Sequence, residues 1–347
     1  MRLRLLLPIS LSLLAAGPSP AGRNHRLEAT PQTVVVGYFD AHAKPILRIA
    51  SGDIIDVDTL ITSTPEALER MGLHPSEVQQ SLRDITTAGL ERGPAGHILT
   101  GPIFVEDAEP GDALEVRVLS ADLAIPYGYQ ACSAKWTFVP EDCEDPKSRI
   151  IRLDLKRKLV EFAPGIEFPV RPFFGILGVA PAVAAGRISS LPPGTHGGNL
   201  DIKELVAGTK VFLPVRTEGA LFEVGDGHAA QGDGESGGTA LETSLRGRLQ
   251  LIVHKDMHLA WPRAETPTDF ISLGADPDLT RAGQIANREM VEFLMKKASL
   301  PRTEANRLAG IAGDLHFGEL SDENVLVYMT LPKAVLGAHL NQNHPVK

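Results

Sequence analysis

Cysteine, aromatic residues and positive charge are all scarce in this sequence of 347 residues. It holds two cysteines, Cys132 and Cys143, and 5% aromatic residues, and its formal net charge is -9. Two cysteines make a weak case for a thiolate metal site, and no basic face of the kind that nucleic acid requires is present. No segment beyond the first residues is apolar for the roughly 20 residues that span a bilayer.

The first residues have the pattern of a secretory signal peptide. Met-Arg-Leu-Arg precedes an uncharged apolar run of about 12 residues, and residues 17–21 end in small side chains. A membrane anchor is the alternative, but the run is shorter than the roughly 20 residues that spanning needs. We therefore expect residues 1–21 to be removed, leaving residues 22–347 as a secreted or periplasmic protein without membrane attachment.

Both cysteines would then enter an oxidising compartment. A disulfide between Cys132 and Cys143 is the expected state, with unpaired thiols as the alternative. Closing so short a loop would stabilise the fold by about 2–3 kcal/mol if the geometry permits.

Glycine and proline are abundant and spread along the chain, with 33 and 26 copies. This distribution favours many short strands joined by tight turns. Apolar and charged residues alternate in 114–118, which we expect to form a hairpin with 101–106. Helical spacing occurs in 65–90, 282–298 and 304–312. We predict a mainly β fold, a sandwich or barrel with a few short helices, with a subdivision near residues 185–195.

A glycine-rich segment from residue 194 to 242 concentrates histidine and carboxylate side chains. His196 and Asp201 lie five residues apart on a backbone that glycine allows to fold tightly. Asp226 and His228 are two residues apart, so on a strand they would face the same side. Imidazole and carboxylate suit zinc or another divalent cation, without any thiolate.

Plainer interpretations of the same residues remain open. Asp-Gly pairs are common in turns, and Asp201 could cap a helix over residues 202–206. Residues 226–235 also offer oxygen ligands for calcium, although the twelve-residue helix–loop–helix calcium pattern is absent.

The order and spacing of several motifs resemble the acetamidase/formamidase family. These are Gly-Gly-Asn-Leu-Asp at 197–201, Gly-Asp-Gly-His-Ala-Ala-Gln-Gly-Asp-Gly-Glu at 225–235, and the segments 97–112, 173–181 and 312–315. The resemblance implies hydrolysis of short carboxylic amides to acid and ammonia, a mostly β fold, a divalent metal and a homo-oligomer. We expect zinc, with calcium as the alternative.

Residue roles follow from the resemblance and from the chemistry of each side chain. The expected metal ligands are His196, Asp201, Asp226 and His228. Glu235 is the expected general base, and Gln231 or Asn199 would hold the oxyanion.

Further candidates lie outside the glycine-rich segment. Glu106 and His97 are second-tier candidates for the site. Asp40 and His42 belong to segment 38–45, which matches the family only loosely.

Two other functions compete with amide hydrolysis at a metal. A serine enzyme is disfavoured because the sequence has no Gly-x-Ser-x-Gly motif. A noncatalytic secreted β-sandwich that binds a small polar ligand or a metal remains the alternative, since a fold and its site can outlast their chemistry.

Overall fold

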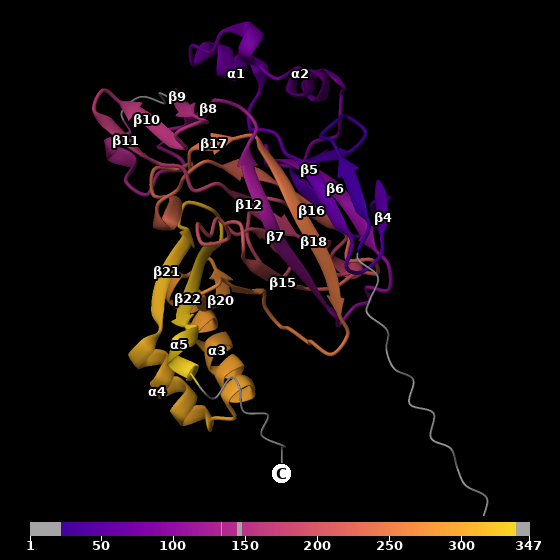
Figure 1. Ribbon diagram of the computed structural model, residues 1–347, viewed down its shortest axis with the longest axis vertical. Coiled ribbons are helices and arrows are strands. Elements are labelled where there is room, and N and C mark those ends of the chain that lie inside the picture. The colour runs from indigo at the N-terminus through magenta and orange to yellow at the C-terminus, as the bar shows by residue number, and fades with distance from the viewer. Residues whose placement is uncertain (1–21, 133, 144–147, 338–347) are drawn as a thin grey trace, which may run out of the picture.

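Two large β-sheets form the body of the protein, with helices at both ends (Figure 1). The computed structural model describes residues 22–132, 134–143 and 148–337. The predicted signal peptide, residues 1–21, lies outside the described residues. A separate two-stranded ribbon pairs β3 (Tyr38–Asp40) with β13 (Arg187–Ser189).

The first sheet has nine strands in the order β1-β5-β18-β7-β15-β19-β20-β22-β21. Only the β1–β5 pair is parallel. The longest pair joins β7 and β18, from Leu123 opposite Leu245 to Ala113 opposite His254. The bounds are β1 Asn24–Leu27, β5 Ile54–Asp58, β7 Ala113–Leu123, β15 Lys210–Pro214, β18 Leu245–His254, β19 Arg263–Glu265, β20 Asp269–Asp276, β21 Asp314–Glu319 and β22 Val325–Pro332.

The second sheet has eleven strands, and its main path is β11-β10-β9-β8-β17-β16-β12-β14. Strand β6 joins this path through β16 and also pairs with β2 and β4. The bounds are β2 Val34–Val36, β4 Leu47–Ile49, β6 Ile98–Val105, β8 Tyr127–Gln130, β9 Arg149–Asp154, β10 Leu159–Ala163, β11 Ile166–Pro169, β12 Phe173–Gly178, β14 Gly197–Asn199, β16 Phe222–His228 and β17 Glu242–Thr243.

Helices cover the two ends of the molecule. Thr64 caps α1 by accepting a hydrogen bond from the backbone of Ala67, and Asp278 caps α3 in the same way. Helix α3 packs on β20 and β22, away from α1 and α2 (Figure 1). Among the described residues, no helix has the length and apolarity to cross a membrane. The bounds are α1 Pro65–Arg70, α2 Gln80–Thr87, α3 Leu279–Ala298, α4 Arg302–Ala312 and α5 Lys333–Leu336, with 3-10 turns η1 Pro75–Glu77, η2 Pro140–Asp142, η3 Val183–Ala185 and η4 Asp233–Glu235.

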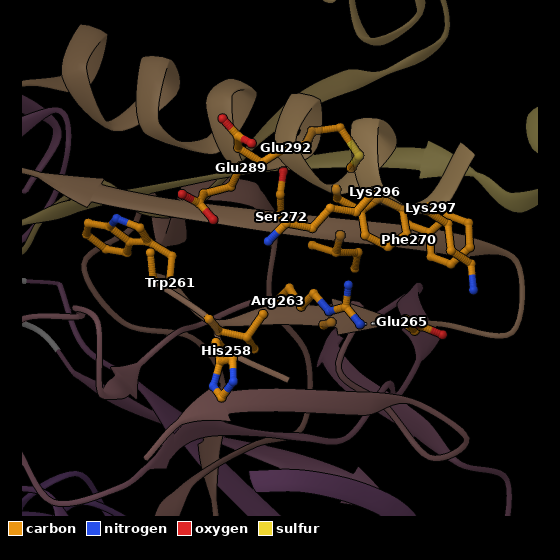
Figure 2. A pocket seen from close by; sticks show the side chains of 16 residues that line it. His258, Trp261, Arg263, Glu265, Phe270, Ser272, Glu289, Glu292, Lys296 and Lys297 are labelled. Atoms are coloured by element: carbon orange, nitrogen blue, oxygen red, sulfur yellow. Dashed lines mark ion pairs between the residues drawn. The ribbon is translucent and has the colours of Figure 1, made fainter. Parts of the chain in front are cut away.

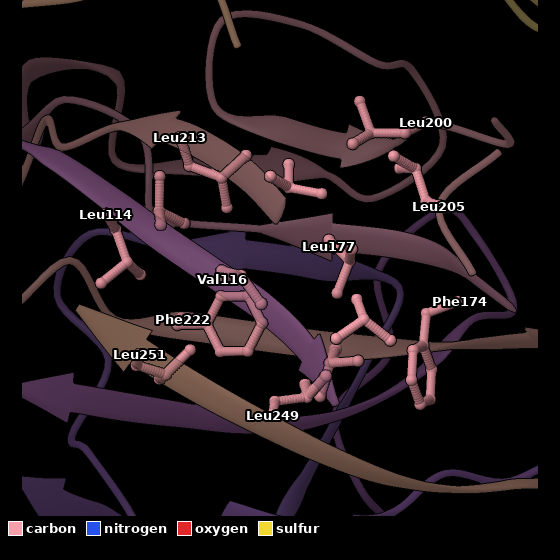
Figure 3. Packing of buried hydrophobic residues seen from close by; sticks show 14 of the residues in the cluster. Leu114, Val116, Phe174, Leu177, Leu200, Leu205, Leu213, Phe222, Leu249 and Leu251 are labelled. Atoms are coloured by element: carbon pink, nitrogen blue, oxygen red, sulfur yellow. The ribbon is translucent and has the colours of Figure 1, made fainter. Parts of the chain in front are cut away.

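The main core lies between the two sheets. Leu114 and Val116 on β7 and Leu249 on β18 pack against Phe174 on β12 and Phe222 on β16 (Figure 3). All five side chains are completely buried. This packing holds β16, which carries part of the glycine-rich segment, and its neighbour β12 on a rigid base.

The mainly β fold and the helices near residues 65–90, 282–298 and 304–312 are confirmed. The hairpin of residues 101–106 with 114–118 is wrong, because β6 and β7 belong to different sheets. The turn between them carries the chain across the core, so both strands bury apolar side chains in the same interior. No helix forms over residues 202–206. Strand β12, before residues 185–195, pairs with β14 and β16, which follow them, and the subdivision expected there stays a prediction.

We expect the substitution Phe222→Ala to lower the free energy of unfolding by about 3–5 kcal/mol, because it opens a cavity between the sheets. Ile166→Ala, at a side chain that is 53% exposed, is the matched control and should cost less than about 0.5 kcal/mol. Urea unfolding measures the loss in free energy of unfolding for both variants. Equal losses in the two variants would contradict the assigned core.

Candidate functional site

Six acidic or imidazole side chains gather in the interior. Their potential ligand atoms form three overlapping groups, and within each group these atoms lie within 4.8 Å of one another. All six residues are buried. The acid cluster consists of Asp201, Asp226, His228, Glu235, Glu242 and Glu319.

Strands of both sheets supply these residues. Asp226 and His228 lie on β16, and Glu242 on β17 is directly opposite His228. Asp201 follows β14 and Glu235 ends η4, both within the glycine-rich segment. Glu319, the last residue of β21, comes from the other sheet. The acid cluster therefore depends on how the two sheets pack.

The backbone at the acid cluster is strained at three carboxylates. Asp201, Asp226 and Glu235 have φ values of 44°, 54° and 47°. This left-handed conformation costs roughly 1–3 kcal/mol for a residue other than glycine. Such a cost is typical of functional sites, where the surrounding structure fixes the direction of a side chain.

Gly175 on β12 makes room for the acid cluster. A Cβ atom at this position would lie 2.5 Å from Asp201 Oδ1, 2.8 Å from Asp226 Oδ2 and 2.8 Å from His228 Cε1. Real Cβ atoms do not approach other atoms so closely, and three of the clustered side chains would have to move.

His228 lies at the centre of the acid cluster. Its Nε2 atom is 3.2 Å from Asp226 Oδ2 and 3.3 Å from Glu242 Oε1, and its Nδ1 atom is 3.0 Å from Gln231 Oε1. The Gln231 amide donates to the backbone oxygens of Asp201 (2.7 Å) and Gly318 (3.2 Å). With both amide hydrogens used, Gln231 Oε1 accepts from Nδ1–H. Burial opposes a charged ring, but Glu242 and Asp226 raise the pKa of His228 well above its usual range, so without a metal Nε2 carries a proton that faces the carboxylates.

Several polar atoms of the acid cluster lack hydrogen bonds. Among the described residues, both carboxylate oxygens of Asp201, Glu242 Oε2 and His228 Nε2 are buried without a hydrogen-bond partner. Buried polar atoms are otherwise almost always paired. These atoms are the ligand types that a divalent cation takes, and they fit such an ion.

Electrostatics at the acid cluster show the cost of crowding like charges. Burial, together with Asp226 and Glu319, raises the pKa of Asp201 well above its usual range. Burial and Asp201 do the same for Glu235. Burial raises the pKa of Glu242 to about 7, opposed by His228. Burial would also raise the pKa of Asp226, but the neighbouring His228 holds it below its usual range.

A cavity of about 240 Å³ opens beside the acid cluster. Asp226, Glu235, Glu242 and Glu319 form its acidic wall. Its other walls include His97, Asn199, Thr62, Tyr129, Trp136 and Asp322. The cavity has room for a small polar molecule.

Most of the expected site residues lie in this region. Asp201, Asp226, His228 and Glu235 are brought together, and Gln231 contacts His228. His97 and Asn199 line the cavity. His97 Nδ1 is 2.9 Å from Ser190 Oγ, and Asn199 donates to Asp322 Oδ2 at 3.0 Å.

Four candidates lie outside the acid cluster and its cavity. His196 packs edge-on against Phe39, with ring centroids 5.1 Å apart, and joins none of the three groups among the described residues. Glu106 follows β6 at the end opposite to His97, where Arg48 pairs with it at 2.9 Å in solvent. Asp40 pairs with Arg187 at 3.0 Å, and the exposed His42 donates its backbone N–H to Asp40.

Glu242, Glu319 and Asp322 also belong to the site region but were not predicted from the sequence. Glu242 follows two apolar residues in Ala-Leu-Glu-Thr. A single carboxylate in such a position was the sequence feature that indicated a buried site residue. Glu319 and Asp322 lie far along the chain in an acidic stretch that looks like a solvated loop. Burial and Glu319 raise the pKa of Asp322 to about 8, which marks its place beside the cavity.

A disulfide joins Cys132 and Cys143, with Cα atoms 5.8 Å apart. Trp136 lies in the loop that it closes and forms part of the cavity wall. The backbone of Phe138 in this loop donates to Ser236 O, next to Glu235.

The model of the acetamidase/formamidase family matches two segments, residues 74–189 and 182–268, which together exceed half of the chain. The chain belongs to the acetamidase/formamidase family. An acetamidase of Yersinia enterocolitica has a TM-score of 0.79 at 28% identity, covering 93% of this chain and 96% of its own. An acetamidase of Bacillus halodurans scores 0.75 at 28% identity, covering 89% and 97%.

Curated sequences of the family match over a shorter length. The acetamidase of Mycolicibacterium smegmatis is 27% identical over 222 residues, which is 47% of this chain and 53% of the relative. The chain thus spans about half the length of the curated relatives that it matches.

We expect Gly175→Ala to weaken divalent-cation binding by about 10–100-fold, because the added Cβ displaces Asp201 and Asp226. Gly232→Ala is the matched control, since a Cβ there meets no atom within 4 Å. Isothermal titration with zinc or calcium measures the affinity of both variants for the cation. A Gly175→Ala variant that binds as the wild type does would refute this geometry.

The pH dependence of stability gives a second prediction. The pKa of Glu242 rises on folding from 4.5 to about 7, and that of Asp322 from 3.8 to about 8. The folded state then holds more protons than the unfolded chain, so the stability of the metal-free protein falls as pH rises from about 4 to about 8. Thermal unfolding in chelator at about pH 5.5 and pH 8 should show the lower Tm at pH 8, and a higher Tm there would contradict the assignment.

Proposed function

We propose that this member of the acetamidase/formamidase family hydrolyses short-chain carboxylic amides to the carboxylate and ammonia, with a divalent metal at the acid cluster. The observation that carries the proposal is the acid cluster itself, open to a small cavity in a chain of this family. Relatives named acetamidase and formamidase support the same chemistry. The cavity volume of about 240 Å³ suits amides with a short acyl chain.

Asp201, Asp226 and His228 are the residues that would hold the metal, with Glu242 beside them. Their unpartnered oxygens and the Nε2 atom support this choice. When bound, a divalent cation supplies Lewis acidity and lowers the pKa of water to about 7. We propose zinc, with calcium as the alternative.

Gln231 is proposed as a positioning residue, in place of the oxyanion role expected from the sequence. Its two amide hydrogens are engaged by Asp201 O and Gly318 O, so neither is free for a substrate. Its oxygen fixes the tautomer of His228, which keeps Nε2 available as a ligand atom.

Glu235 is proposed as the general base and acid. Its Oε1 accepts a hydrogen bond from the backbone of Ala240, which fixes the carboxyl group in the cavity wall. Because burial and Asp201 raise its pKa, Glu235 is suited to take a proton from water and return it to the leaving nitrogen.

His97 and Asn199 are proposed to bind the carbonyl oxygen of the amide. Both line the cavity, and each is fixed through one atom, His97 by Ser190 and Asn199 by Asp322. Burial lowers the pKa of His97, which favours a neutral ring with one N–H to donate.

Export of the protein is a further part of the proposal. The disulfide of Cys132 and Cys143 supports it, because such bonds persist in secreted or periplasmic proteins. A homo-oligomer, which the family resemblance implies, stays a prediction.

The test is ammonia release from formamide, acetamide and propionamide before and after chelation. We expect chelation to abolish release, and zinc or calcium to restore it. Glu235→Gln should lower kcat by about 100-fold or more, because it removes the proton carrier. Glu106→Gln, an exposed carboxylate paired with Arg48, is the matched control and should leave kcat unchanged.

Two results would contradict this proposal. Full activity after complete removal of metal would exclude the metal requirement. A bound divalent ion with no ammonia released from any of the three amides would favour a noncatalytic binding module.

A further inference from the structure

A second cavity, of about 390 Å³, lies between strands β19 and β20 and helix α3 (Figure 2). None of its lining residues belongs to the cavity at the acid cluster. The aromatic rings of Trp261, Phe270 and Phe293 form much of its apolar wall. Its volume falls in the range of about 300–1,000 Å³ that is typical of small-molecule sites.

Arg263 on β19 lies in this cavity across from α3 (Figure 2). Its guanidinium stands between the rings of Phe212 and Phe293, 4.9 and 5.0 Å from their centroids. Within the described part of the chain, its buried Nε atom has no hydrogen-bond partner. The one hydrogen bond of the guanidinium there is a weak one to the sulfur of Met257, at 3.8 Å.

The guanidinium is partly buried, with 23% of the Arg263 side chain exposed, and it lacks a strong acceptor. Arginine carries five N–H donors, and a buried donor without an acceptor is costly. The nearest carboxylate oxygen, Glu265 Oε1, is 3.9 Å away, which is too far for a hydrogen bond. Because Nε is closed off from solvent, an acceptor with two oxygens in the cavity would pair with the terminal Nη atoms of the guanidinium.

Neighbouring charges favour an anion at this position. Glu265 also faces Lys333 at 3.4 Å, and Glu292 is paired with Arg302. Of the acidic residues that line the cavity, this leaves Glu289, whose pKa burial raises towards the neutral form. Lys296 and Lys297, in the last turn of α3, add positive charge to the same cavity.

We propose that this cavity binds a small organic acid whose carboxylate pairs with the terminal Nη atoms of Arg263 while its apolar body packs against Trp261, Phe270 and Phe293. Arginine and carboxylate match in a two-bond geometry, which gives the acid its orientation. The inference is independent of amide hydrolysis at the acid cluster. An acidic side chain of a second copy of the protein also carries a carboxylate that would pair with Arg263. The test distinguishes this source from a free acid.

The experiment is isothermal titration of the full mature protein with 4-phenylbutyrate and with 4-phenylbutanol, which has the same apolar body without the charge. We expect the acid to bind at least about tenfold more tightly than the alcohol. Arg263→Met and Arg263→Lys should each weaken binding of the acid by about tenfold or more. Arg307→Met, which removes an exposed charge on α4, should bind as the wild type does.

Arg263→Lys keeps the positive charge but lacks the paired Nη donors, so it tests the pairing even if Arg263→Met fails to fold. Equal affinity for the acid and the alcohol would overturn the proposal. Unchanged affinity in a folded Arg263→Lys variant would do the same. A third result would also overturn the proposal: the wild type binds no acid, and the Arg263 variants lose oligomeric mass in light scattering. The acceptor for Arg263 would then be an acidic side chain of a second copy.

Discussion

Repulsion among buried carboxylates is the constraint on which the rest of this structure depends. Asp201, Asp226, Glu235, Glu242 and Glu319 share one buried region with a single central imidazole, His228. Removing ionised groups from water costs on the order of several kcal/mol for each ion. Most of these groups have a raised pKa, so they avoid this cost by keeping their protons. We propose that a divalent cation neutralises their charge in the working protein.

The fold is arranged to hold this unfavourable group of charges in place. The two sheets bury a continuous apolar core, which fixes β12 and β16 as a rigid platform. Gly175 leaves the space that the acid cluster fills, and left-handed backbone at three acidic residues turns their side chains inward. Stability from the core thus offsets local strain at the acid cluster, as is common at functional sites.

Local sequence patterns predicted the parts of this arrangement that local geometry controls. Asp226 and His228 share one face because a strand alternates its side chains, and caps at Thr64 and Asp278 begin helices where spacing indicated them. Strand pairing is not local, so the hairpin of residues 101–106 with 114–118 was wrong and Glu242 and Glu319 were missed. His196 sits in a suitable motif, but its ring turns towards Phe39, which no spacing rule reveals.

The most direct test of the central claim is the metal content of the purified protein, measured by mass spectrometry after exhaustive dialysis against metal-free buffer. The account predicts about one or more equivalents of a divalent metal per chain in the wild type, and a loss of that metal when Asp201→Asn removes one charge from the acid cluster. An active wild-type protein that contains no divalent metal would contradict it.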